Sequence, residues 1–233
     1  MYDQSLFLQT LSRFARVLPA QYDLELALGE LTESVAAVLD LVGSGVTMAE
    51  EGQLRFVTAV SQASGELEHI QEQQQAGPCQ DAYDTGEVVC VTDVRVETTR
   101  WPEFAAAATR LGVAGVAGIP MRLSSQIIGA LNLYSSTPRK WSEEDLAAAT
   151  VLADVATSYV INASKMRQQQ QLSEQLQQAL ESRVVIEQAK GITAQQHAVT
   201  VEEAFHLMRG HARNNNASIR AVAEAIVAVG LQV

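Results

Sequence analysis

The sequence has few residues of the types that build disulfide frameworks, metal sites and rigid loops. It contains two cysteines, Cys79 and Cys90, four histidines and five prolines in 233 residues. The cysteines have no CxxC spacing, so we interpret both as reduced, buried thiols. No histidine has a cysteine or carboxylate cluster at ligand spacing, which argues against a metal site. Cys79 is also a candidate redox or chromophore-attachment residue, but no basic neighbour in the sequence would lower its pKa.

Long apolar runs are absent as well. No stretch of 18 or more apolar residues is present, and the first residues, MYDQSLFLQTLSRF, lack the basic start and apolar block of a secretory signal. With 47% hydrophobic and 18% charged residues the composition is globular, and the length suits one domain plus a smaller one. We therefore expect a cytoplasmic protein with no membrane partner.

Positive charge is scarce in the first part of the chain. Residues 1–164 hold nine Lys/Arg against twenty-one Asp/Glu, a balance of −12, whereas residues 165–233 hold seven against six. Such an acidic front part repels phosphate, which argues against nucleic-acid binding there. The nearly neutral tail permits it.

The front part alternates helical and strand patterns. Apolar residues at spacings of three and four predict helix over residues 1 to about 42, ended by Gly43. Four short runs then predict strands, the last two joined by a hairpin loop at Ser124–Gln126. Helices are predicted in GPCQDAYDTG and RWPEFAAAATRLG. The pattern indicates an α+β domain, with one antiparallel sheet and helices on a face.

A very long helix is predicted from Ser142, which is followed three residues later by an acid. Neither Pro nor Gly occurs again until Gly191, where we expect the helix to end. Its apolar seam runs through Leu152, Ala156, Tyr159, Ala163 and Met166 and resumes in a shifted phase at Leu172, Leu176 and Ala179. We interpret residues 146 to about 189 as a parallel coiled coil with a stutter, and hence a homodimer. The alternative is a helix packed only on its own domain.

Two shorter helices follow. Thr200 and Glu203 form a capping box before an apolar face that we expect to bury Phe205 in the core, with Val201, Ala204, Met208 and Ala212. Asn214–Asn216 reads as a turn. Ser218 caps a last helix, and Gly230 follows it.

At this point the residues resemble known families. The strings ALESRVVIEQAKGI, TVEEAFHLMRGHAR and ASIRAVAEAIV, over about residues 173–230, resemble the ANTAR domain, a three-helix RNA-binding module of bacterial transcription antiterminators. The strings AGPCQDAYDTGEVVCVTDV and IIGALNLYSSTPRKWSEEDL, within about residues 20–162, resemble a GAF sensor domain. The expected division is therefore a GAF-like domain over 1–162 and a coiled-coil extension with ANTAR domain over 163–233. Thr193, where a larger apolar residue is common, and Gly210, inside the second helix, depart from the family pattern.

The resemblance implies RNA hairpins in nascent transcripts as the partner, and it suggests which residues meet them. Arg183, Glu187 and Lys190 share one helix face, where the bland alternative is a solvated face with an Arg183–Glu187 pair. Gly191 leaves room for an RNA backbone beside Lys190, whose side chain we expect to be exposed. Further candidates flank the turn: Arg213, Asn214 and Arg220. The alternative role for Phe205, stacking on a base, is opposed by its position on the apolar face.

A GAF domain implies a small-molecule effector of unknown identity, and no resident cofactor is predicted. Trp101 and Phe104 either line its pocket or close the core. The predicted function is a signal-responsive, dimeric antiterminator. Two alternatives are a GAF enzyme such as a methionine sulfoxide reductase, for which only Cys79 and Cys90 are available, and a dimeric scaffold without RNA binding. No catalytic residue is assigned, because no His or Lys stands near the acids to suggest an activated nucleophile.

Overall fold

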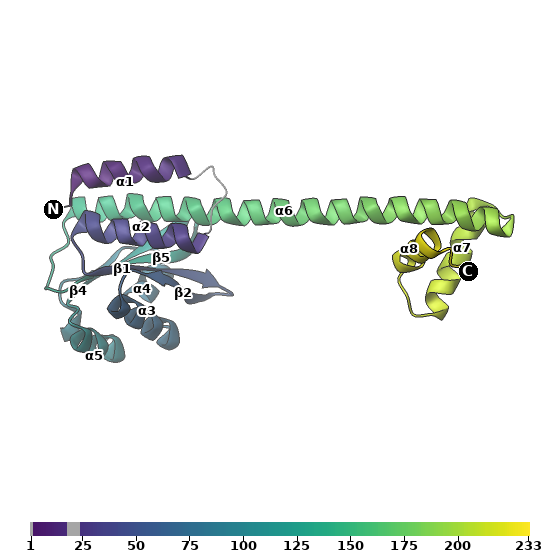
Figure 1. The fold of residues 1–233 in the computed structure, drawn as a ribbon. Coiled ribbons are helices and arrows are strands. Elements are labelled where there is room, and N and C mark those ends of the chain that lie inside the picture. Colours follow the sequence, from purple (N-terminus) through teal and green to yellow (C-terminus); the bar gives the residue numbers. More distant parts are fainter. Residues whose placement is uncertain (1, 18–23) are drawn as a thin grey trace. The chain divides into compact units, whose positions relative to one another are not determined.

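The computed structural model describes residues 2–17 and 24–233, and the chain divides into two compact units, Met1–Ser164 and Lys165–Val233. Figure 1 shows the elements of each unit. In chain order they are α1 (Gln4–Val17), α2 (Leu24–Leu39), β1 (Gly43–Glu50), β2 (Gln53–Ala59), α3 (Gln62–Gln74), α4 (Pro78–Thr85), β3 (Val89–Val91), the 3-10 turn η1 (Val94–Val96), α5 (Pro102–Leu111), β4 (Gly115–Leu123), β5 (Gln126–Ser135), α6 (Glu143–His197), α7 (Val201–Asn214) and α8 (Ile219–Val229).

The first unit is built on one antiparallel sheet with the strand order β2-β1-β5-β4-β3. The β1–β2 hairpin turns at Glu51 and Gly52, which both have positive φ (52° and 81°), as a tight two-residue hairpin turn requires. The β4–β5 loop is two residues long, one shorter than expected, because Gln126 already pairs with Leu123. The predicted α+β fold is confirmed, although helices cover both faces of the sheet rather than one.

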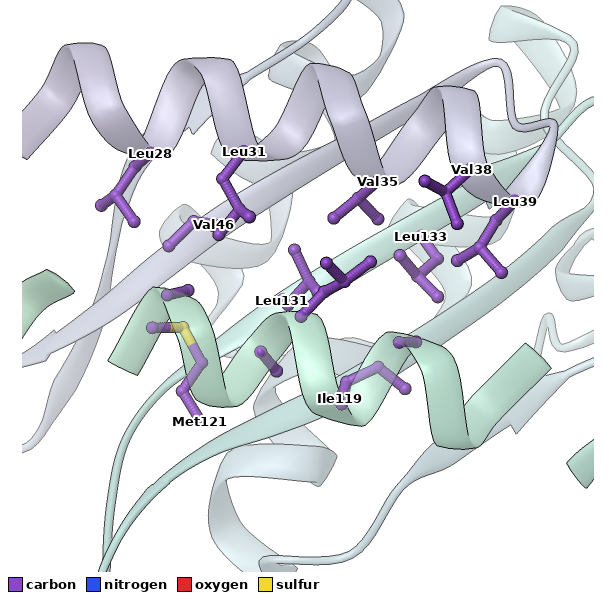
Figure 2. Close-up of a cluster of buried hydrophobic side chains, with 14 of the residues drawn as sticks. Leu28, Leu31, Val35, Val38, Leu39, Val46, Ile119, Met121, Leu131 and Leu133 are labelled. Carbon is purple, nitrogen blue, oxygen red and sulfur yellow. The ribbon is translucent and has the colours of Figure 1, made fainter. Parts of the chain in front are cut away.

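Helices α1, α2 and the first part of α6 lie on one face (Figure 1). Leu28, Leu31, Val35, Val38 and Leu39 project from α2 onto the sheet side chains that Figure 2 labels. Each of these side chains is almost fully buried, which is worth about 1.5–3 kcal/mol apiece. The helix expected over residues 1 to about 42 is thus two helices, and residues 18–23 of that expectation lie outside the described residues.

The first part of α6 is a core helix of this unit. Leu152, Ala156 and Tyr159 are at most 1% exposed, and the Tyr159 hydroxyl donates to the carbonyl oxygen of Phe14 at 2.9 Å. The expectation that these three residues form a seam with a second chain is therefore wrong, because the chain's own sheet and α1 already cover them. In the described residues α6 is also the helix whose composition would fit a membrane span, with an 18-residue window of mean hydropathy 1.4 that is 44% buried. Core packing accounts for the buried apolar residues in the first part of this helix, such as Leu152 and Tyr159.

Helices α3, α4 and α5 lie on the opposite face (Figure 1). Gly86 and Gly112 end α4 and α5 in the left-handed conformation. Helix α3 was not predicted. Its buried residues include Ser64, Glu68 and Gln71, so the apolar periodicity that marks a helix is missing from its sequence.

The second unit packs the end of α6 against α7 and α8. Its small core consists of Ala189, Met208, Ala212, Val222, Ala223 and Ile226. Contrary to expectation, α6 does not end at Gly191 but continues to His197. Helix α7 is continuous through Gly210. Each glycine costs a helix about 1 kcal/mol relative to alanine. Packing of Ala189 and Thr193, both fully buried on either side of Gly191, offsets that cost.

Candidate nucleic-acid interface and sensor core

The turn between α6 and α7 fixes the relative position of these two helices. Ala198 takes a left-handed conformation with φ of 55°, and α7 then begins with a capping box. The Thr200 hydroxyl accepts from the Glu203 N–H at 3.2 Å, and the Glu203 carboxylate accepts from the Thr200 N–H at 2.9 Å. The predicted cap is confirmed. It holds the last turns of α6 beside the first turns of α7.

Lys190 lies in this junction and is more enclosed than expected. Its side chain is only 18% exposed, and its Nζ donates to both carboxylate oxygens of Glu187 at 2.9 and 3.0 Å. The Arg183–Glu187 pair of the solvated-face alternative is not the one that forms among the described residues. Nζ also lies 5.4 Å from the ring centroid of Phe205 on α7, within cation–π range. The expectation of a freely exposed Lys190 is wrong, because the ring and the carboxylate both hold it.

Two arginines of α7, Arg209 and Arg213, form a basic surface together with Lys190. Arg209 lies 5.9 Å from the Phe205 ring centroid, and its carbonyl oxygen accepts from Nε of Arg213 at 3.4 Å. Arg213 and Asn214 are exposed at the end of α7, where the Asn-rich turn begins as predicted. Arg209 was missed by the sequence reasoning. Its four-residue spacing from Phe205 and from Arg213 was the available signal.

Arg220 belongs to a different part of the unit. Its Nε donates to Glu224 at 2.8 Å, and Nη1 donates to the Ser182 hydroxyl on α6 at 3.1 Å. Ser182 and Lys190 are eight residues apart, so the two contacts lie about 12 Å apart along the helix. Arg220 thus links α8 to α6, while its side chain remains 41% exposed.

The last two predicted residues, Arg183 and Gly191, are exposed on α6. A Cβ added to Gly191 would meet nothing within 4 Å, so packing inside the unit does not require glycine at this position. Thr193, two residues further, is fully buried, and its hydroxyl has no hydrogen-bond partner among the described residues. Threonine thus stands where the family pattern commonly has a larger apolar residue, and no hydrogen bond compensates for the burial of its hydroxyl.

The first unit contains a buried polar cluster between α3 and the sheet. The Glu68 carboxylate is fully enclosed and accepts from Asn132 Nδ2 at 2.8 Å and from the Tyr134 hydroxyl at 2.9 Å. Gln71 donates to the same hydroxyl at 3.3 Å and accepts from the backbone N–H of Cys79 at 2.9 Å. Burial raises the pKa of Glu68 from 4.5 to about 8, and the two hydrogen bonds oppose that rise only in part. Glu68 is therefore largely a neutral acid at pH 7.

A glycine makes room for this carboxyl group. A Cβ on Gly45 of β1 would lie 2.2 Å from Glu68 Oε1, a distance that no side chain could accept. Cys79 closes the cluster from α4, with its Sγ 3.6 Å from the Thr47 hydroxyl. Burial raises the pKa of the Cys79 thiol, so the thiolate that a nucleophile or redox sensor needs is disfavoured. Cys90, interpreted from sequence as buried, is exposed.

Trp101 and Phe104 are 3% and 2% exposed and belong to the core under α5. They also contribute to the wall of a surface cavity of about 190 Å³, together with Gln74, Ala76, Arg100, Pro102 and Glu103. The Arg100 guanidinium covers the Trp101 ring at 4.2 Å and pairs with Asp81 at 2.6 Å. Both alternatives for the two aromatic residues are thus compatible with their positions. In residues 2–17 and 24–233, no group of three or more His, Cys, Asp or Glu is arranged to hold a metal ion.

Comparison with sequence families identifies both parts of the chain. The GAF domain matches residues 23–159, and the ANTAR domain matches residues 174–227. Among proteins of curated function, no sequence matches this one.

Solved structures of similar fold include several GAF domains. The GAF domain of an Acinetobacter phosphoenolpyruvate-protein phosphotransferase aligns with a TM-score of 0.56 at 15% identity, covering 72% of this chain and 99% of that one. Free methionine-R-sulfoxide reductase from Neisseria meningitidis, in complex with its substrate, aligns with a TM-score of 0.55 at 16% identity, covering 71% and 95%. The GAF domain of a phosphoenolpyruvate-protein phosphotransferase from Coxiella burnetii aligns with a TM-score of 0.54 at 18% identity, covering 69% of this chain and 95% of that one. At these identities the likeness concerns the fold alone.

Proposed function

Because this chain belongs to the GAF domain family and carries an ANTAR domain on a long helix, we propose that it is a signal-responsive, dimeric protein that binds hairpins in nascent transcripts and prevents their termination. The GAF and ANTAR architecture is that of a sensor joined to an RNA-binding antitermination regulator. The dimer, the hairpins and the response to a signal are the proposed part.

The observation that carries the RNA-binding role is the basic surface of the ANTAR unit. Lys190, Arg209 and Arg213 follow one another from α6 along α7, with Arg183 and Gly191 on α6 and Asn214 beyond Arg213. With a balance of +1 from Lys165 onward, the unit cannot hold RNA by bulk charge. A few placed cations must therefore carry the phosphate contacts. Arg220 would contribute through the exposed part of its side chain.

Dimerisation is supported by an apolar stripe on α6 beyond Ser164. Met166, Leu172, Leu176, Leu180 and Val184 are between 37% and 64% exposed. From Leu172 to Val184 each step is four residues and advances about 40° around the helix, so the side chains stay on one side. A helix with such a stripe is stabilised by pairing with an identical helix. Two ANTAR units on one dimer would then engage two hairpins at a high effective concentration.

We assign the sensing role to the first unit, with a small-molecule effector and with Trp101 and Phe104 at the candidate cavity. Its −12 balance disfavours RNA there. Nascent transcripts place the protein in the cytoplasm. An enzyme of the methionine sulfoxide reductase type is a weaker candidate, because burial disfavours the Cys79 thiolate and that chemistry needs reactive thiols.

Replacing Lys190 by alanine should weaken binding to a two-hairpin leader transcript markedly. The change removes a cation. It also removes the Lys190 ammonium that lies 2.9 Å from the Glu187 carboxylate in the wild type, so this carboxylate would repel phosphate. For a single-stranded loop, the slope of log affinity against log salt should shrink by roughly 0.7 for each lost phosphate contact. The measurement is filter binding of full-length protein at several salt concentrations.

Lys165→Ala is the matched control for this experiment. It removes the same charge from an exposed position 25 residues earlier on the same helix. It should change neither affinity nor slope. If Lys190→Ala behaves like this control, the RNA-facing surface lies elsewhere.

A further inference from the structure

Phe205 does not occupy the core position that its sequence suggests. The buried residues of α7 are Ala204, Met208 and Ala212, which recur every four residues. Phe205 lies one residue beyond this line, about 100° around the helix, and is only partly buried. It is also absent from the core cluster of the second unit. An aromatic ring at the edge of so small a unit is a feature that core packing does not explain.

Cations from two helices lie around this ring. Lys190 Nζ of α6 is 5.4 Å from the ring centroid, and the Arg209 guanidinium of α7 is 5.9 Å from it. Glu187 partly neutralises Lys190. The Arg209 guanidinium has no ion pair with an acid among residues 2–17 and 24–233, so its charge is available to a ligand. The ring therefore forms an apolar patch with positive charge at its border.

From this arrangement we infer that Phe205 is a stacking platform for one unpaired base of an RNA loop, with Lys190 and Arg209 holding the phosphates beside it. This inference rests on the proposed RNA-binding function and adds the chemical class of the bound group. Unpaired bases in loops expose their faces and stack on aromatic side chains, whereas bases in a paired stem do not. A cation displaced from the ring by a base can move to the flanking phosphate, so its interaction with the ring is exchanged for an ion pair.

The proposal separates two kinds of contact within one surface. Stacking is apolar and should leave the salt dependence unchanged, whereas contacts of Lys190 and Arg209 with phosphate should set it. Phe205→Leu keeps an apolar side chain but removes the aromatic face. Phe205→Tyr keeps the face. Leu207→Ala, which removes an exposed apolar side chain of the same helix, is the matched control.

The probe is a hairpin RNA selected in vitro against the full-length protein from a library with a constant stem and a random loop. Phe205→Leu should weaken binding by about 5- to 150-fold, the range expected for one stacked base. The salt slope and the helix content should stay as in the wild type. Phe205→Tyr and Leu207→Ala should bind within about twofold of the wild type, well inside the energy of one stacked base. Arg209→Gln should lower the salt slope instead.

A second measurement needs no variant. With 5-iodouridine placed at each loop position in turn, irradiation of the wild-type complex should crosslink one position to Phe205, as mapped by mass spectrometry. Wild-type affinity in Phe205→Leu, or crosslinks that map only to other residues, would overturn the stacking assignment while leaving RNA binding intact. A selection that enriches no RNA would instead refute the proposed function itself.

Discussion

Replacing Leu176 and Leu180 of α6 by glutamate is expected to convert the proposed dimer into monomers. The two side chains are 63% and 64% exposed and lie at the middle of the apolar stripe. In a pair of helices, four carboxylates would face one another across a seam that apolar burial stabilises. Without the dimer, the second hairpin loses its high effective concentration. Affinity for a two-hairpin transcript should fall roughly 100- to 10,000-fold, whereas affinity for a single hairpin should change little.

The control adds the same charges to the opposite side of the same helix. Gln171 and Gln178 are exposed and lie about 140–180° around α6 from Leu176 and Leu180, so Gln171→Glu with Gln178→Glu should leave the dimer intact. Sedimentation gives the mass of each variant, and filter binding gives its affinity for one and two hairpins. A wild-type protein that is monomeric at micromolar concentration would contradict the dimer. If both double variants lose dimer mass and two-hairpin affinity to the same extent, the added charge is responsible and not its position on the seam.

The second large effect concerns the buried acid of the sensor unit. Glu68→Gln should remove a pH dependence of stability that the wild type shows between about pH 4.5 and pH 8. The pKa of Glu68 is raised by burial to about 8 in the folded protein, against 4.5 for the ordinary side chain. In this window the folded state holds a proton that the unfolded state has released. Its contribution to the free energy of unfolding therefore falls as pH rises, by roughly 1.4 kcal/mol per pH unit.

The glutamine variant keeps the shape of the side chain and an oxygen that accepts from the Tyr134 hydroxyl. Its free energy of unfolding relative to the wild type should thus rise steadily from pH 5 to pH 8 and then level off. Urea unfolding followed by fluorescence of Trp101 and Trp141 reports on this unit. Stability curves that stay parallel for the two proteins across this range would show that Glu68 is ionised in the folded state.

The parts of the fold that the sequence predicted are those in which a local signal and the tertiary structure agree. Ser218 caps α8 and Gly230 ends it in the left-handed conformation, as their residue types indicate. Helix α3 was not predicted because it buries Glu68 and Gln71, whereas a helix is recognised in a sequence by apolar residues on its buried face. Gly191 was wrongly expected to end α6, since a glycine costs less than the core contacts on either side of it contribute.

The candidate site shows the same limit. Residue types and spacing alone favoured a solvated charged face at Lys190, and it was the family resemblance that predicted an RNA contact there, which stays a prediction. Neither could show that Lys190 is held by Glu187 and Phe205, because those contacts depend on the angle at which α7 leaves α6. For the same reason Leu152 and Tyr159 looked like a seam for a second chain. The period of apolar residues along a helix shows only that one face is apolar. The tertiary structure decides which partner covers that face.

The most direct test of the proposed antitermination activity is to measure transcription through a terminator. Leader sequences of the transcripts that the protein binds would be transcribed in vitro by bacterial RNA polymerase, and the fraction of transcripts that pass the terminator would be measured against protein concentration. The account predicts that this fraction rises with the wild-type dimer over the range in which it binds the two hairpins. A fraction that stays constant while the RNA is fully bound would contradict antitermination.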